Sequence, residues 1–254
     1  MKKQYLLMIA VLVLTTGAWA QEYKLPKSTG RLSIQEVNNV KIEGYNGNGI
    51  VFTSSSFNKD KDDRAKGLRA ISSMGLEDNT GLGLSVVETN GVIEVRQLKK
   101  MDGPNILIKV PHGVSVKYVH TSPYGDDVEI KNFEGELYVS TVHNDVQLTN
   151  VTGELTIKTV HGDIEAGFGS AINKVASLTS THGHVDVAIP TSTKANLKLN
   201  TSWGEIFIDP DFKLELDKSG AMIKYSDKMT AKINGGGTEI TLSSTHDNVY
   251  LRKK

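Results

Sequence analysis

The sequence predicts an all-β protein, most specifically a parallel β-solenoid with coils of about 18–21 residues, a period typical of stacked repeats. Three observations predict this fold: a contiguous internal repeat, an alternation of apolar and polar residues, and a corner motif that recurs along the chain. Residues 128–145 (VEIKNFEGELYVSTVHND) and residues 146–163 (VQLTNVTGELTIKTVHGD) are equal in length and identical at nine of eighteen positions. So short a fixed period indicates an architecture in which each repeat covers the next.

Each repeat also alternates apolar and polar residues with a period of two, which is the pattern of a strand with one buried face. In the second repeat, Leu155 and Ile157 are separated by the polar Thr156. We therefore expect Leu137, Val139, Leu155 and Ile157 to form stacked apolar ladders in one core, with Thr156 on the opposite, solvated face.

The third observation is a corner rich in Gly, Asn and Asp, which tolerate the backbone conformations of tight turns. The corner recurs at nearly even spacing at His143, His161, His182 and Trp203, and again at His246 after a step of double length that we interpret as two coils. Identical residues at identical corners are expected where coils stack like on like. The alternative is an antiparallel β meander or sandwich, in which every such corner is a hairpin turn.

The chain before Leu84 follows these patterns less closely. Residues 57–83 include the charge cluster Lys59–Arg64, and Asp63–Ser72 is predicted to form a short helix. We interpret this region as an exposed insertion between early coils. The predicted organisation is therefore a single β-repeat domain over residues 21–254 with a charged loop or helix insertion near 57–83.

Residues 1–20 have the layout of a secretory signal peptide. A basic start precedes the apolar run Tyr5–Leu14, which is too short to span a bilayer, and small residues precede Gln21. We expect cleavage between Ala20 and Gln21. The exported chain would then be periplasmic, attached to the cell surface or extracellular. No later stretch approaches the roughly twenty apolar residues of a transmembrane helix.

Composition narrows the choice of partners. Lys plus Arg and Asp plus Glu are balanced at 29 each, without a basic stripe, which gives no electrostatic reason to bind nucleic acid or anionic lipid. The chain has no cysteine. An exported chain without disulfides must be stabilised by burial and hydrogen bonding alone.

Several segments together resemble a known family. They are VKIEGYNGNGIVF at residues 40–52, DDRAKGLRAI at residues 62–71, and the repeated G-E-L-x-V/I-x-T-V-H-G/N-D units. The chain is similar over most of Leu32–Leu251 to bacterial envelope proteins with β-strand repeats, catalogued as a domain of unknown function and close to the adhesin-head domains called GIN-like. The resemblance implies a right-handed parallel β-solenoid in the periplasm or at the surface, and it supplies no catalytic residues.

Three histidines are the candidates for a metal site. A solenoid would place the imidazoles of His143, His161 and His182 about 4.8 Å apart, and imidazole suits Zn, Cu and Ni. The alternative is a stack of rings that covers the corner. Tyr124 and Trp203 occupy what the spacing suggests are equivalent positions, and neither is a good ligand for these metals. The pattern therefore favours stacking, and we expect no metal or other cofactor.

Two carboxylates are the candidates for catalysis. Asp145 and Asp163 would lie one coil apart, and paired carboxylates about 5 Å apart are what a retaining glycosidase uses. Asp is also favoured at turns because its side chain bonds the local backbone. Glu136 and Glu154 recur at the other corner, so acidic residues are a feature of every coil. The pattern favours a structural role, and we assign no catalytic residue.

Three functional classes follow from these observations. The leading one is a non-catalytic, adhesin-like envelope protein whose surface, rich in Thr, Lys and Glu, binds an envelope protein or a glycan. The second is a carbohydrate-active β-helix enzyme that uses stacked carboxylates. The third is a periplasmic metal-binding module that uses the histidine column.

Overall fold

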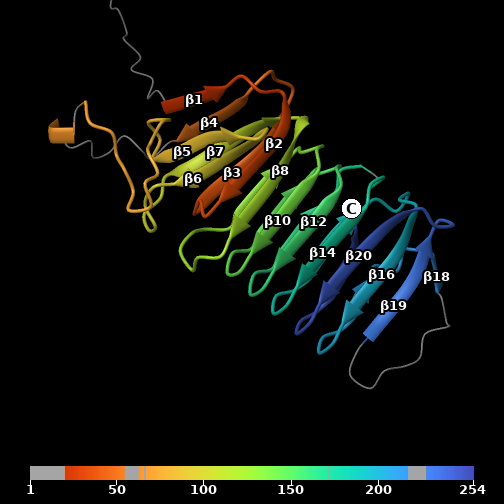
Figure 1. Cartoon of the computed structure of the whole chain (residues 1–254). Coiled ribbons are helices and arrows are strands. Elements are labelled where there is room, and N and C mark those ends of the chain that lie inside the picture. Colours follow the sequence, from red (N-terminus) through yellow and green to blue (C-terminus); the bar gives the residue numbers. More distant parts are fainter. Residues whose placement is uncertain (1–20, 55–62, 66, 171, 217–226) are drawn as a thin grey trace, which may run out of the picture.

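The computed structural model describes residues 21–54, 63–65, 67–170, 172–216 and 227–254. They form an elongated stack of strands in two sheets around one apolar core, which confirms the all-β prediction (Figure 1). In spatial order, the described strands of the first sheet are β1 (Gln21–Leu25), β4 (Ile50–Ser54), β7 (Asn105–Pro111), β3 (Asn39–Tyr45), β9 (Val128–Lys131), β11 (Val146–Thr149), β13 (Ile164–Gly167), β15 (Val185–Ile189), β21 (Val249–Lys253) and β17 (Ile206–Ile208). Those of the second sheet are β18 (Leu214–Leu216), β19 (Asp227–Ile233), β16 (Ala195–Thr201), β20 (Thr238–Ser244), β14 (Ala176–Ser180), β12 (Leu155–Thr159), β10 (Leu137–Thr141), β8 (Gly113–His120), β2 (Thr29–Gln35), β6 (Val92–Gln97) and β5 (Leu84–Thr89).

Parallel pairing builds the middle of the stack. Each coil is one strand of the second sheet, a corner, and one strand of the first sheet, as in coil β10–β11. Leu137 pairs with Leu155, and Leu155 pairs with Ala176, so equivalent positions of successive coils lie side by side. The middle of the molecule is therefore solenoid-like, with the coil length that the repeat predicts.

Both sheets are mixed as a whole, because antiparallel strands close the two ends. At one end β4 pairs with β7, β1 with β4, and β5 with β6; at the other, β19 pairs with β16 and β18 with β19. These strands cover edges that a purely parallel stack would leave open. The prediction of a parallel solenoid is thus confirmed in part, and its right-handedness stays a prediction.

The order of the coils in space differs from their order in the chain at both ends. Coil β20–β21 lies between coils β14–β15 and β16–β17, and coil β2–β3 lies between β6–β7 and β8–β9 (Figure 1). Although the corners of His182 and Trp203 are successive in the chain, their coils are not in contact, because the coil of His246 lies between them. A fixed period identifies coils but does not say which coil each one covers.

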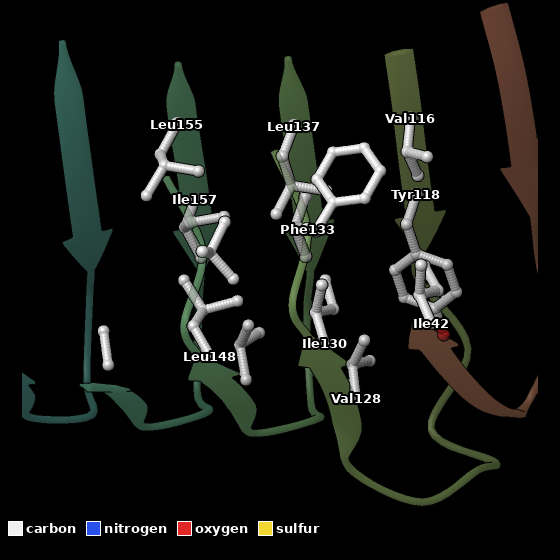
Figure 2. Close-up of a cluster of buried hydrophobic side chains, with 14 of the residues drawn as sticks. Ile42, Val116, Tyr118, Val128, Ile130, Phe133, Leu137, Leu148, Leu155 and Ile157 are labelled. Atoms are coloured by element: carbon white, nitrogen blue, oxygen red, sulfur yellow. The ribbon is translucent and has the colours of Figure 1, made fainter. Parts of the chain in front are cut away.

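Apolar ladders run through the core along the stack. Leu137 and Leu155 occupy the same height on adjacent strands, as do Val139 and Ile157, and all four are buried (Figure 2). Thr156 lies on the outer face and is partly exposed. The predicted inside and outside faces of these strands are confirmed.

A buried phenol packs against the same ladders. Tyr118 is fully buried on β8, and its hydroxyl donates a hydrogen bond of 2.9 Å to the Val37 carbonyl (Figure 2). Burial, with the nearby charge of Glu36, raises the pKa of this phenol well above its ordinary value. The hydroxyl therefore serves as a neutral donor that satisfies a backbone carbonyl.

The insertion contains less helix than the sequence predicts. Asp63–Ala65 form a single 3-10 turn, η1, and the segment that follows runs as a loop closed by a bridge between Ile71 and Glu77. Gly67 has φ of +82°, a left-handed conformation that an α-helix over Asp63–Ser72 excludes. Residues 57–62 and 66 of the predicted insertion lie outside the described residues.

The predicted signal peptide, residues 1–20, also lies outside the described residues, and cleavage between Ala20 and Gln21 stays a prediction. Within the described ranges, no helix is long and apolar enough to cross a membrane.

Candidate functional site

The candidate residues gather where a strand of the second sheet turns into the next strand of the first sheet. We call this surface the stacked corner; it comprises residues 142–145, 160–163, 181–184, 245–248 and 202–205. A buried hydroxyl ends each second-sheet strand that leads into the stacked corner and bonds the corner backbone. Thr159 Oγ1 donates to the Gly162 carbonyl at 2.6 Å, and Ser244 Oγ accepts from the Asp247 N–H at 3.0 Å. The hydroxyl column consists of Thr141, Thr159, Ser180, Ser244 and Thr201.

Glycine is favoured in this corner because the backbone of the neighbouring coil leaves no room for a Cβ, and not because the corner requires a positive φ. A Cβ on Gly162 would lie 2.1 Å from the Asn144 carbonyl oxygen, and one on Gly183 would lie 2.3 Å from the Gly162 oxygen. The predicted positive φ occurs at the opposite corner, where Asn132 and Asn150 have φ of +52° and +55°. The two corners therefore use Gly and Asn for different reasons.

A column of exposed rings runs along the stacked corner. The ring centroids of His143 and His161 are 5.3 Å apart, those of His161 and His182 4.8 Å, and those of His182 and His246 4.7 Å. All three pairs lie within 14° of parallel, and Trp203 continues the column at 6.5 Å from His246. The stacked rings that the sequence predicts are present, with His246 as a further member.

Tyr124 does not continue the column as its spacing suggests. Seven residues separate β8 from β9, whereas four separate β10 from β11. Counted back from the first-sheet strands, Gly125 is level with His143. The longer corner therefore shifts Tyr124 away from the column position.

The geometry of the column disfavours metal binding between neighbouring rings. An imidazole holds a metal through a lone pair in the plane of its ring, at about 2.0–2.1 Å for zinc. The planes of His161 and His182 are 8° from parallel with their centroids 4.8 Å apart, so their lone pairs do not converge on one ion. That His143, His161 and His182 bind no metal stays a prediction, with ring stacking as its physical basis.

A row of carboxylates lies beside the column, one residue before the first-sheet strands. Asp127 Oδ1 accepts from the Asp145 N–H at 3.2 Å, Asp145 Oδ1 from the Asp163 N–H at 2.8 Å, and Asp163 Oδ1 from the His184 N–H at 2.8 Å. Each carboxylate thus joins its coil to the next. Asp145 and Asp163, the candidates for a glycosidase pair, are engaged in this backbone bonding.

Burial raises the pKa of the Asp145 carboxyl, and the charges of Asp127 and Asp163 add to the shift while the bond from the Asp163 N–H opposes it. This is the direction that a general acid needs. The same direction follows from like charges stacked in a row, which is a consequence of the repeat. The geometry therefore favours the structural role for Asp145.

The row ends in a cluster of different composition. His184 replaces Asp at this position of its coil, and its Nδ1 lies 3.1 Å from Asp163 Oδ1. Asp247 joins them from the inserted coil β20–β21, so that one ligand atom of each residue lies within 4.8 Å of the others. All three are partly buried. Sequence reasoning missed this cluster. The position of His184 could have been found, because His184 follows Gly183 just as Asp163 follows Gly162. The proximity of Asp247 could not, because it depends on the exchanged order of the coils.

The family model described as Toastrack DUF4097 matches residues 83–252. The chain belongs to the Toastrack DUF4097 family. Its resemblance to a β-strand-repeat family of unknown function is thereby confirmed. The match covers the stacked corner in full. Comparison with curated proteins finds no match.

Two solved structures are similar to this Toastrack chain. A candidate cell adhesion protein from Clostridium sporogenes has 9% identity and a TM-score of 0.46, with 93% of this chain and 100% of that one covered. A candidate adhesin from Bacteroides fragilis has 11% identity and a TM-score of 0.35, with 94% and 98% covered. At these values the likeness bears on neither partner nor activity.

Further rings lie beside the column at the C-terminal end of the Toastrack stack. Phe207 on β17 stacks on Tyr250 of β21 with 5.2 Å between ring centroids, and the Arg252 guanidinium lies 5.1 Å from the Tyr250 ring. Trp203 is 66% exposed and Phe207 44% exposed. The sequence patterns did not reveal this group, although Phe207 and Tyr250 occupy paired positions of β17 and β21, which are successive first-sheet strands in the chain.

Proposed function

We propose that this protein is a non-catalytic, exported envelope protein, adhesin-like in function, that binds a protein or a glycan through its stacked corner. One observation carries the proposal: the corner presents a column of stacked, exposed rings that ends in Trp203, which is 66% exposed.

The core does not account for these rings. The apolar ladders are already buried on the inner faces of both sheets, whereas the column lies on the outside of the corner. Trp and Tyr are enriched in binding interfaces because they combine large apolar area with a polar edge. Exposed Trp203 and Phe207 are therefore better explained by a partner than by folding.

Stacking also prepares the surface for binding. Each ring of the column is held against a neighbour, and each backbone beneath it is tied to the next coil, as by the bond of 2.8 Å from the His182 N–H to the Val160 carbonyl. Less side-chain freedom is then lost when a partner binds, which favours affinity.

The carboxylates support a non-catalytic role. Asp145 and Asp163, which an enzyme of the second functional class would use, accept backbone hydrogen bonds from the next coil. We therefore propose that acidic residues hold the corner and that rings form the contact surface.

Binding of the chain from Gln21 onward to isolated bacterial envelope tests this proposal. We expect Trp203→Ala to weaken binding at least tenfold, as loss of an aromatic interface anchor does. Thr156→Ala, on the outer face of β12, serves as the matched control and should bind normally. Periodate treatment of the envelope should abolish binding if the partner is a glycan, and protease treatment should abolish it if the partner is a protein.

Equal binding by the two variants would overturn the assignment of the surface, and release of shortened glycans would overturn the non-catalytic role. Export has its own measurement, which is the N-terminal mass of protein recovered from the envelope. We expect a chain beginning at Gln21, and an intact Met1 would contradict cleavage after Ala20.

A further inference from the structure

We infer that Asp163, His184 and Asp247 form a binding site for a divalent transition-metal ion, for which Zn²⁺ is the best match. The site lies beside the ring column, at the corner where the inserted coil β20–β21 meets coil β14–β15. It differs from the sequence-based expectation that the protein binds no metal, and it uses none of the histidines of the column.

The distances fit a shared ion. Zinc binds imidazole nitrogen at about 2.0–2.1 Å and carboxylate oxygen at about 2.0–2.2 Å, so two ligand atoms of one tetrahedral ion lie about 3.4 Å apart. His184 Nδ1 and Asp163 Oδ1 are 3.1 Å apart, and all three ligand atoms lie within 4.8 Å of one another.

The donor atoms also select the kind of ion. One imidazole nitrogen with two carboxylates suits zinc and its neighbours, whereas Ca²⁺ and Mg²⁺ take oxygen ligands throughout. Asp247 Oδ1 accepts the Asn248 N–H at 2.6 Å, and a carboxylate retains a second oxygen for a metal. Partial exposure leaves room for water as the fourth ligand.

The surrounding charge favours a cation. Asp127 and Asp145 continue the row beyond Asp163, and Asp247 adds a further carboxylate. Among the described residues, no lysine or arginine lies within ion-pair distance of these four carboxylates. A dication at the site offsets the repulsion that this row accumulates.

The imidazole is held in position by the neighbouring coil. The His184 ring meets the Tyr250 ring edge to face, at 6.0 Å and 83°, and the Tyr250 hydroxyl accepts a hydrogen bond of 2.9 Å from Asn248 Nδ2. Nδ1 of His184 is thereby directed to Asp163. In the ring column, by contrast, each imidazole faces a parallel neighbour and shares no convergent partner.

Calorimetric titration of the chelator-treated chain with Zn²⁺ tests this inference. We expect one saturable site, and Asp163→Asn, His184→Gln and Asp247→Asn should each weaken binding at least about tenfold, since even supporting residues around a metal contribute 10–100-fold. His161→Gln, from the column, is the matched control and should bind as the unmodified chain does. Ca²⁺ should not compete at equal concentration.

Two further measurements keep the test independent of folding. Circular dichroism of each variant without metal shows whether its fold is retained. Co²⁺ bound to the unmodified chain should shift the NMR signals of the His184 imidazole more than those of His161. Absence of saturable Zn²⁺ binding, or binding lost in His161→Gln and retained in His184→Gln, would overturn the site.

Discussion

The middle of the stack and its two ends are built from similar coils but assembled differently. From β10 to β15, each coil lies on the coil that precedes it in the chain. At the ends, the coil nearest each terminus, β2–β3 or β20–β21, sits one place inside the stack, and antiparallel strands cover the outside. The coil that comes last in the chain is therefore not the last in space.

This difference determines which side chains meet at each candidate site. The repeat of the middle coils yields identical corners, which produce the column of His143, His161 and His182. The exchanged order at the C-terminal end brings together residues that are distant in the chain, namely Asp247 with Asp163 and His184, and Tyr250 with His184. The regular middle supplies the scaffold, and the exchanged end supplies chemical variety.

The largest expected effect comes from removing the inserted coil. A chain that ends at Gly237 lacks β20 and β21, which pair with β14 and β15 on one side and with β16 and β17 on the other. We expect hydrogen exchange to show loss of protection in β17 and at the β16 amides that bond β20, because these strands lose their parallel neighbours, whereas β16 keeps its antiparallel partner β19. A stack in chain order would keep those amides protected, so retained protection would contradict the exchange.

In the regular middle, a single truncation should have a smaller but clear effect. Leu155 is fully buried between Leu137 and Ala176, so Leu155→Ala should reduce the free energy of unfolding by about 2–5 kcal/mol in denaturant titration. Thr156→Ala, on the outer face of the same strand, should change it by less than about 0.5 kcal/mol. Comparable losses at both positions would contradict the assignment of faces.

The next largest effect on stability is expected where the backbones of neighbouring coils approach each other closely. A Cβ on Gly153 would lie 1.7 Å from the Gly135 carbonyl oxygen, whereas one on Gly167 would meet nothing nearer than 3.9 Å. Gly153→Ala should therefore cost about 1–3 kcal/mol through overpacking, with little effect of Gly167→Ala. Thermal unfolding should give a lower midpoint for Gly153→Ala than for Gly167→Ala. Equal midpoints would show that the close backbone contact at Gly153 does not limit which residue fits there.

The smallest effect is expected on the outside of the corner. His161 is exposed, and the column already accommodates the larger ring of Trp203, so His161→Tyr should change stability by less than about 0.5 kcal/mol. Thermal unfolding without added metal checks this. A large destabilisation would show that the imidazole does more than stack.

Sequence patterns predicted what depends on near neighbours in the chain. The alternation around Leu155 predicted the buried face, the repeat predicted the coil length, and the corners predicted the stacking of His161 on its neighbours. Each of these features follows from one coil covering its successor, which a fixed period reveals.

The same patterns could not predict contacts that depend on the exchanged order. His182 and His246 are separated in the chain by the whole of coil β16–β17 and strands β18 and β19, yet their ring centroids are 4.7 Å apart. The even spacing instead indicates Trp203 as the neighbour of His182, and both corners have the same form. The helix predicted over Asp63–Ser72 failed for a local reason, the left-handed conformation of Gly67.

The proposed metal site depends on the exchanged order of the C-terminal coils. Disulfide formation tests this order most directly. Ser177 pairs with Thr241 on the adjacent strand, while Lys198 lies one strand further on, and the chain has no cysteine of its own. Adjacent strands are about 4.8 Å apart and alternate ones about 9.6 Å, beyond the reach of a disulfide. Mild oxidation should crosslink the Ser177→Cys/Thr241→Cys variant and leave Ser177→Cys/Lys198→Cys unlinked. A crosslink in the second pair and none in the first would mean that the coils stack in chain order.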